Sequence, residues 1–445
     1  MNNINDMTEG NPLHLMVRFS VPILLANILQ LFYVIADSAV AGRILGVTAF
    51  ASIGATATLH WFVLSIVNGF VNGFGVVFAQ YFGAKDINGF RKVFISAVYL
   101  MIIISITIGC AGVLGSGFLL MMLNTPPELL NGAVIYLSWL LGGICITFAY
   151  NLLGAILRAL GDSKTPLKGM ILASLLNIVL DIILVRPLGI LGIAIATLSA
   201  QFTACGYCFI ALCKTGLLQG SIFKWDITSA RILLRIGLPL GLRNGIIEVG
   251  GLLVQRYINN YGMEFIAGIA AAKRMYSLLI IPGSAFEAAN GIFTAQNYGS
   301  KRFDRVKQGI NSGRWLMLVS VAVIMIVLLP FRYFILGLLF DGEPVQINAV
   351  LEIGVKQLTL LMLGLPLLYL LLLYRSTLEG MGKPFIPMLS GFIELFFRIL
   401  SVFLLTPIIG EIGILVSIPI GWTVAAGLLI ITYYVVCKKL IVVNN

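Results

Sequence analysis

Charged residues and histidines are scarce in this 445-residue chain. Only 11% of its residues are charged, whereas 59% are hydrophobic, and its mean hydropathy is strongly positive. A chain with so few charges cannot cover its surface with polar groups, which excludes a water-soluble globular protein. The two histidines, His14 and His60, leave no histidine-based proton relay beyond a role for His60 alone.

Several familiar motifs are also missing. The segment GDSKTP (161–166) lacks the glycine spacing of a phosphate-binding loop, which disfavours any process driven by ATP. The N-terminal residues MNNINDMTEGNPLH have no basic region and no cleavage site, so no signal peptide is expected. We expect no enzymatic activity, no cofactor and no structural metal.

What the chain has instead is long, continuous apolar runs. A bilayer core of about 30 Å needs roughly 20 apolar residues per helical span. Barrel strands would alternate apolar and polar residues, so the sequence predicts an all-α, polytopic membrane protein with about twelve transmembrane helices. The expected spans are 15–37, 52–80, 93–123, 132–156, 166–186, 190–213, 233–258, 265–297, 312–340, 353–378, 388–406 and 411–436.

Basic residues concentrate in the loops that follow even-numbered spans. Lys85, Arg91 and Lys92 lie in one such loop, whereas NTPPELLNG (124–132) on the opposite side has none. Because basic loops stay in the cytoplasm, both termini are predicted to be cytoplasmic in a multi-pass protein of the cell membrane. The net charge of +11 is then explained by topology and anionic lipid, without nucleic acid. We expect a monomer in the lipid bilayer.

Landmarks of the first half recur in the second at an offset of about 216 to 221 residues. FAQYFGAKD (78–86) matches TAQNYGSKR (294–302), and LRALGDSKTP (157–166) matches LEGMGKPFIP (378–387). Because six is an even number, two six-helix bundles enter the membrane with the same polarity, as in transporters with parallel repeats and alternating access. The predicted organisation is an N-terminal lobe (1–213), a cytoplasmic linker (214–231) and a C-terminal lobe (232–445).

Two carboxylates interrupt the apolar spans of the first lobe, Asp37 and Asp181. Each costs at least about 2.5–3.5 kcal/mol at the bilayer centre, so each needs an explanation. Asn177 lies four residues before Asp181, on the same helix face. If both carboxylates converge, they form a coupled pair that takes up a proton or, with Asn oxygens, holds Na⁺. Alternatively, Asp37 is solvated at the outer end of its helix near Arg43, and Asn177 only joins helices.

The charges of the second lobe do not fall at the repeat-equivalent positions, which are Val254 and Val402. Glu394 and Arg398 are four residues apart, so we expect an intrahelical ion pair in a charge-compensated polar core. Lys273 and Arg274 favour an anionic substrate over a cationic one. The candidate substrate or second-lobe site residues are Glu248, Arg274 and Glu287.

The duplicated layout, the paired loops, VIADSAVAGRILG (34–46) and NIVLDIILV (177–185) together resemble the multidrug and toxic compound extrusion (MATE) transporters. The similarity is greatest to the archaeal and bacterial branch that includes the DNA-damage-inducible proteins. The resemblance implies efflux of varied, often cationic amphiphiles in exchange for protons or sodium ions. It places Tyr136, Asn151 and Asn177 beside Asp37 and Asp181, and Glu248 resembles an acidic residue that some members use for cations or substrate.

The sequence therefore predicts an antiporter for small amphiphilic compounds that works by alternating access. A flippase, or an exporter of a lipid-linked or anionic metabolite, is the alternative, and it is favoured if Lys273 and Arg274 face the cavity. A channel is disfavoured because the chain has no repeated acidic ring and no filter-like loop.

Overall fold

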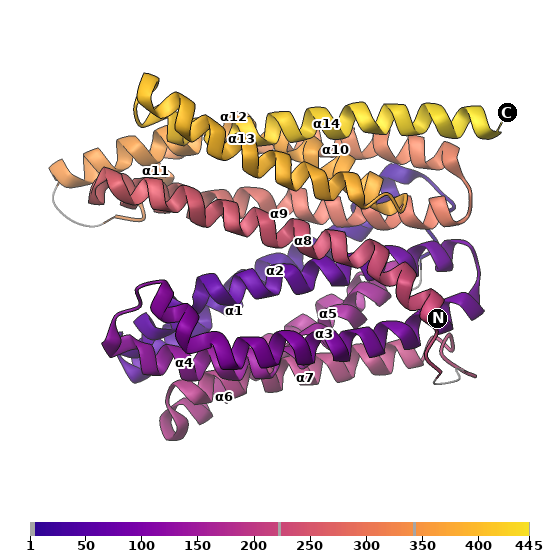
Figure 1. Ribbon diagram of the computed structural model, residues 1–445, viewed down its shortest axis with the longest axis horizontal. Coiled ribbons are helices and arrows are strands. Elements are labelled where there is room, and N and C mark those ends of the chain that lie inside the picture. Colours follow the sequence, from indigo (N-terminus) through magenta and orange to yellow (C-terminus); the bar gives the residue numbers. More distant parts are fainter. Residues whose placement is uncertain (1–4, 221–223, 341–343, 445) are drawn as a thin grey trace. The chain divides into compact units, whose positions relative to one another are not determined.

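The structure, a computed structural model, describes residues 5–220, 224–340 and 344–444, and these form helices and no strand (Figure 1). The prediction of an all-α membrane protein is confirmed. The helices are α1 (Pro12–Leu45), α2 (Val47–Gly83), α3 (Ile87–Met122), α4 (Pro127–Gly142), α5 (Ile144–Ala159), α6 (Lys164–Leu188), α7 (Ile190–Cys213), α8 (Ile227–Ile258), α9 (Met263–Gly299), α10 (Phe303–Leu328), α11 (Arg332–Gly337), α12 (Pro344–Gly380), α13 (Phe385–Ile409) and α14 (Ile412–Asn444), with a 3₁₀ turn η1 (Asn259–Tyr261).

Most of the predicted spans correspond to these helices, but the span expected at 312–340 is wrong at both ends, because α10 covers Phe303–Leu328 and the short α11 follows as a separate helix. Within the described residues, 10 helices are long and apolar enough to cross a membrane, or 11 if α4 and α5, which meet at a bend of 48°, count as one span. The remaining long helix is α8, whose apolar sequence is interrupted by Arg243, Asn244 and Glu248. With α8 as a span, the layout agrees with the expected number of about twelve.

The first span was predicted to end at Asp37, but α1 continues to Leu45. The extra turns are stabilised by packing, because Ala41 is fully buried in an apolar cluster with Tyr136, Val185 and Ile193. Asp37 therefore lies inside a helix and not at its end, and its side chain is only 8% exposed. The alternative of a solvated Asp37 is not supported, although Arg43 itself is exposed.

The chain divides into two compact units. Unit 1 contains the described residues up to Glu9, then Arg18–Gly241 and Ala295–Lys301; unit 2 contains Gly10–Val17, Leu242–Thr294 and the chain from Arg302 onwards. Three helices, α1, α8 and α9, contribute residues to both units. The lobes proposed from the repeat, 1–213 and 232–445 around the linker 214–231, remain a prediction.

The repeat is also visible in the backbone. Gly189, between α6 and α7, and Gly410, between α13 and α14, have left-handed φ values of 60° and 62°. Lys85 and Lys301, at matching landmarks, adopt φ values of 58° and 59°. A positive φ is uncommon for a residue with a side chain, so its recurrence at matched positions supports a duplicated architecture.

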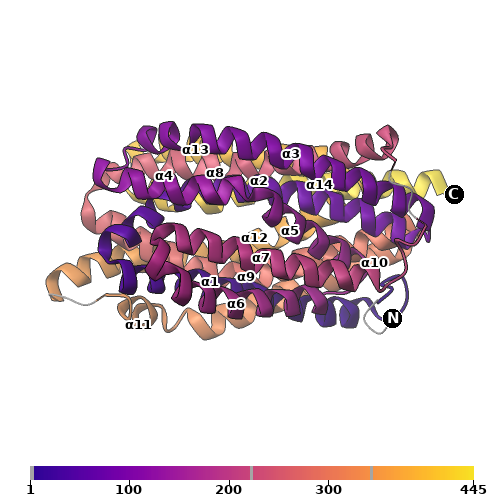
Figure 2. The same ribbon diagram turned by 90° about the horizontal axis from the view of Figure 1, so that it is seen from below.

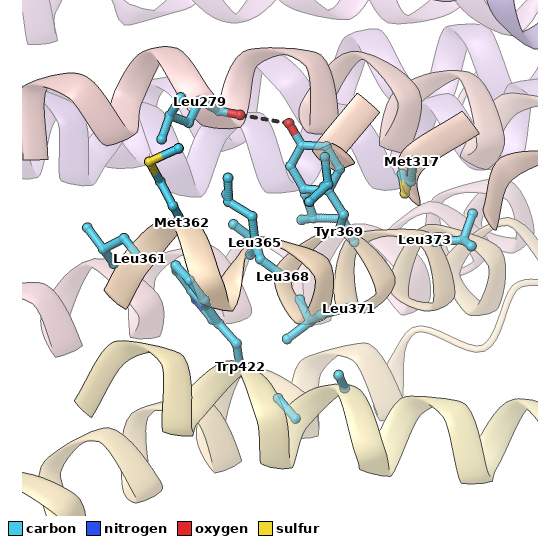
Figure 3. Close-up of a cluster of buried hydrophobic side chains, with 14 of the residues drawn as sticks. Leu279, Met317, Leu361, Met362, Leu365, Leu368, Tyr369, Leu371, Leu373 and Trp422 are labelled. Carbon is cyan, nitrogen blue, oxygen red and sulfur yellow. Dashed lines mark hydrogen bonds between the residues drawn. The ribbon is translucent and has the colours of Figure 1, made fainter. Parts of the chain in front are cut away.

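Each unit has its own apolar core. In unit 1, α6 packs along α7 and α5 packs against both α2 and α7 (Figure 2). In unit 2, the core is formed by α9, α10, α12 and α14, with Leu336 of the short α11 (Figure 3). There Tyr369 is fully buried and donates its hydroxyl hydrogen bond to the carbonyl of Leu279 at 2.7 Å. This bond satisfies the one polar atom of a large core side chain.

The start of α6 is fixed by a buried carboxylate. Asp162 is 6% exposed and accepts hydrogen bonds from the backbone N–H groups of Lys164 (3.0 Å) and Thr165 (2.9 Å). The Thr165 hydroxyl donates a third bond to Asp162, at 2.5 Å. These bonds pair N–H groups that the first helical turn leaves without a partner, so Asp162 sets where α6 begins.

We predict that Asp162→Ala lowers the free energy of unfolding by about 2–3 kcal/mol, because it leaves buried donors unpaired. Asp86→Ala is the matched control, since Asp86 is exposed and caps α3 with a single bond to the Gly89 N–H. It should cost about 1 kcal/mol. Thermal unfolding in detergent measures both; equal losses would contradict a special role for Asp162.

Candidate functional site

Asp37 on α1 and Asp181 on α6 lie together inside unit 1. Asp181 and Asn177 are fully buried, and Asp37 is nearly so. The two carboxylates interact electrostatically with each other, and Asn177 lies one helical turn from Asp181 on the same face of α6. The structure thus brings together two carboxylates from helices far apart in the sequence.

Three hydroxyl groups surround this pair. Tyr136 on α4 is 7% exposed and interacts electrostatically with both carboxylates. Thr197 on α7 lies beside Asp37 and Tyr33. Tyr136 had been expected here, whereas Tyr33 and Thr197 had not. Tyr33 precedes Asp37 by one helical turn, so the sequence alone could have indicated that both lie on the same face of α1. No sequence pattern indicates Thr197, because only the packing of α7 brings it to the site.

Most polar atoms of this cluster have no hydrogen-bond partner within the described part of the chain. They are Oδ1 of Asp37, both carboxylate oxygens of Asp181, both amide atoms of Asn177 and the hydroxyl of Tyr33. Buried polar groups are normally paired. Among the described residues, no basic side chain forms an ion pair with Asp37 or Asp181. The charges of two buried carboxylates without a positive partner are an arrangement that a bound cation would stabilise.

Asn151, the remaining residue expected at this site, lies half-buried on α5. Its side-chain amide donates to the Thr147 carbonyl of the same helix at 3.0 Å. Its place beside the two carboxylates stays a prediction.

Unit 2 carries its charges in a different way, as buried ion pairs. Arg243 on α8 binds Glu379 on α12. Glu394 on α13 accepts from Arg375 at 3.2 Å and from Arg398 at 3.0 Å. All five side chains are buried. The intrahelical Glu394–Arg398 pair is confirmed, whereas Arg375 and Glu379 had not been expected in this network because their partners lie on other helices.

The other charged residues of unit 2 lie around this network. Glu287 is half-buried and interacts electrostatically with Arg243 and Arg375. Glu248 is exposed and interacts with Arg398. Lys273 donates to Gln255 at 2.8 Å.

Arg274 stands apart from the network. Its side chain is exposed, and it takes part in none of the ion pairs found among the described residues. The structure therefore brings Glu248 and Glu287, but not Arg274, to the buried arginines. Within the same residues, no cluster of three or more His, Cys, Asp or Glu side chains could hold a metal ion.

Known proteins resemble this chain over most of its length. The MatE family profile matches twice, at residues 22–183 and 239–404, so the matches begin 217 residues and end 221 residues apart. The offset agrees with that of the internal repeat.

Curated relatives include the probable multidrug resistance protein YpnP of Bacillus subtilis, 35% identical over 68% of each chain. The multidrug export protein MepA of Staphylococcus saprophyticus is 22% identical and covers 96% of this chain and 94% of its own.

Solved structures show the same fold. A crystal structure of a MATE protein in the bent conformation superposes with a TM-score of 0.90 at 21% identity, covering 99% of this chain and 98% of the other. An outward-facing MATE multidrug transporter gives a TM-score of 0.85, also at 21% identity, and covers 99% of both chains. The double family match, the similarity to YpnP and the shared fold lead to one conclusion: the chain belongs to the MATE family of multidrug efflux transporters.

Proposed function

We propose that this protein is a secondary active transporter that exchanges extracellular protons or sodium ions for small amphiphilic compounds from the cytoplasm. The observation that carries this proposal is the pair of buried carboxylates, Asp37 and Asp181, which lack a basic partner among the described residues. Their burial is costly unless a cation neutralises them. The names of the relatives, multidrug resistance and multidrug export proteins, support efflux of varied compounds.

Coupling requires that the cation binds two conformations with different affinity. The site's ligands come from α1 and α6, with Tyr136 on α4 and Thr197 on α7 as neighbours. An apolar cluster, one helical turn beyond Asp37 on α1 and beyond Asp181 on α6, joins the same four helices through Ala41, Tyr136, Val185 and Ile193. Filling the site removes the repulsion between the carboxylates and so changes how α1 packs on α6. Binding of an extracellular cation thereby lowers the affinity of the protein for the bound substrate. Release of the cation to the cytoplasm restores that affinity.

The donor set fits both coupling ions. A proton shared by the two carboxylates removes one charge and needs no further ligand. Sodium is a hard cation that prefers several oxygen ligands, and the unpartnered amide oxygen of Asn177 lies on the same helix face as Asp181. Asn177 therefore distinguishes the two ions, because only sodium gains from its oxygen.

We place the protein in the cell membrane as a monomer with both termini in the cytoplasm, since the basic loops lie on the side of the termini. No nucleic acid, enzyme activity or resident cofactor belongs to this function.

A second candidate, export of an anionic or lipid-linked compound, is favoured by one observation. Arg375 and Arg398 share the single carboxylate of Glu394, which leaves an excess positive charge, and the buried Nε atoms of both arginines have no hydrogen-bond partner among the described residues. Exposed Arg274 adds nothing to this excess, because it is outside the network. The nearby Glu248 and Glu287 counter it, so we prefer cationic substrates.

We predict that Asp37→Asn and Asp181→Asn each slow gradient-driven efflux of a fluorescent cationic dye by at least about tenfold, because a coupling free energy of about 1.4 kcal/mol is worth a factor of ten. The assay uses proteoliposomes with an imposed pH or sodium gradient. Asp86→Asn, which changes an exposed carboxylate, should behave as the wild type. Full coupled efflux in both site variants would overturn the assignment.

We predict that Asn177→Leu selectively removes efflux driven by a sodium gradient and leaves efflux driven by a pH gradient, because the amide oxygen serves only the metal ion. Comparing both gradients in the wild type shows which ion drives transport. Identical responses of the wild type and the variant to both gradients would exclude Asn177 as a ligand.

We predict that a lipophilic cation competes with the dye for efflux whereas a lipophilic anion of similar size does not. Dye efflux is measured at rising competitor concentration under one fixed gradient. Competition by the anion alone would replace the cationic-substrate proposal with the second candidate.

A further inference from the structure

The N-terminal residues Asn5–Glu9, here called the N-terminal strap, are held inside unit 1 although they precede α1. Met7 and Thr8 are only 1% and 4% exposed. The Met7 backbone N–H donates to Oε1 of Gln296 at 2.8 Å, and its carbonyl accepts from the Asn297 side chain at 3.1 Å. Two side chains therefore bind the strap through its backbone at Met7.

The strap binds to a surface formed by buried amide side chains and a glycine turn. Gln296 and Asn297 are fully buried, and Gln296 also donates to the Ala159 carbonyl at the end of α5, at 2.7 Å. Asn5 donates to the Gly161 carbonyl at 3.3 Å. Gly161 has φ +80°, and a Cβ there would lie 2.0 Å from the Asn5 carbonyl oxygen. Only glycine both adopts this conformation and leaves room for the strap.

The same place is a close crossing of helix ends. A Cβ on Gly83 of α2 would lie 2.0 Å from the Gln296 carbonyl oxygen, and a Cβ on Gly299 of α9 would lie 2.0 Å from the Gln80 carbonyl oxygen. Gln80 and Gln296 occupy matching positions of the repeat, in AQYFG and AQNYG. The ends of α2 and α9 thus meet backbone to backbone in a reciprocal contact, and the strap binds on it.

The end of α9 is also where this helix changes unit. Met263–Thr294 belong to unit 2, whereas Ala295–Gly299 belong to unit 1. The strap itself belongs to unit 1 and is followed by Gly10, φ +88°, the first residue of a segment of unit 2. Most of α9 therefore belongs to unit 2, but its last turn belongs to unit 1. The hydrogen bonds of Met7 with Gln296 and Asn297 hold this last turn in place.

We propose that the N-terminal strap is a conformational latch of the transport cycle, which fastens the end of α9 to α2 and the α5–α6 turn in one state and releases it in the other. The inference rests on the proposed alternating-access function, because only that function requires the end of α9 to move. Releasing the strap breaks its bonds to two fully buried amides, and a buried amide that loses its partner is costly. The latch therefore opens only where water reaches this end of unit 1.

Hydrogen–deuterium exchange of the full-length protein tests the latch. The coupling ion is varied by comparing low pH with high pH, and added sodium with its absence. We expect the protection of the strap backbone, corrected for the intrinsic pH dependence of amide exchange, to change by at least about tenfold between ion-bound and ion-free protein, together with the protection around Asn177 and Asp181. If the α6 region responds and the strap does not, the latch is excluded while the proposed function stands. If neither responds, the proposed function fails as well.

Two variants distinguish a strap that acts as a latch from a strap that only stabilises the fold. Gln296→Ala removes the acceptor of the Met7 N–H, and Gly83→Ala separates α2 from α9 without touching the strap. Both should leave the strap exchanging fast under every ion condition and change the rate of dye efflux at least about threefold. Gln308→Ala, the same substitution at an exposed site of α10, should change neither. A strap that stays protected in both variants, or variants that lower only the Tm, would overturn the proposal.

Discussion

The burial of Asp37 and Asp181 together, without a basic partner in the described part of the chain, is the constraint on which the rest of unit 1 depends. Like charges in a low-dielectric interior repel strongly and lose their hydration. Such an arrangement is costly while the carboxylates are charged, and this cost is the basis of the proposed cation site. The length of α1, the capped start of α6 and the apolar cluster shared by α1, α4, α6 and α7 determine where the two carboxylates lie.

Unit 2 also buries carboxylates, but it pairs them with basic side chains. Its buried carboxylates, Glu379 and Glu394, are paired with Arg243, Arg375 and Arg398, so their charges are compensated inside the protein. Breaking a buried pair by removing one partner is costly, so exchange of a cation at this network would be disfavoured. The two units therefore carry their buried charges differently: among the described residues, Asp37 and Asp181 of unit 1 have no basic partner, whereas Glu379 and Glu394 of unit 2 form ion pairs with arginines.

Most of the fold could be predicted from the sequence, because long apolar runs indicate membrane helices and matched motifs indicate the repeat. The i, i+4 spacing of Asn177 and Asp181, and of Glu394 and Arg398, also gave their shared faces correctly. The contacts between distant helices could not be predicted: Thr197 and Arg375 reach their neighbours through packing alone. The extension of α1 beyond Asp37 was missed for the same reason, since tertiary contacts override local signals. The break between α4 and α5, in contrast, has a local signal in the pair Gly142 and Gly143.

The most direct test of the central claim is isotope-edited infrared difference spectroscopy of the aspartate carboxylates in the wild-type protein and in the two single Asp→Asn site variants. The account predicts that the signals of Asp37 and Asp181 change together on acidification or on addition of sodium, and that either substitution alters the response of the remaining carboxylate. Two carboxylates that respond independently, or that do not respond to any cation, would contradict it.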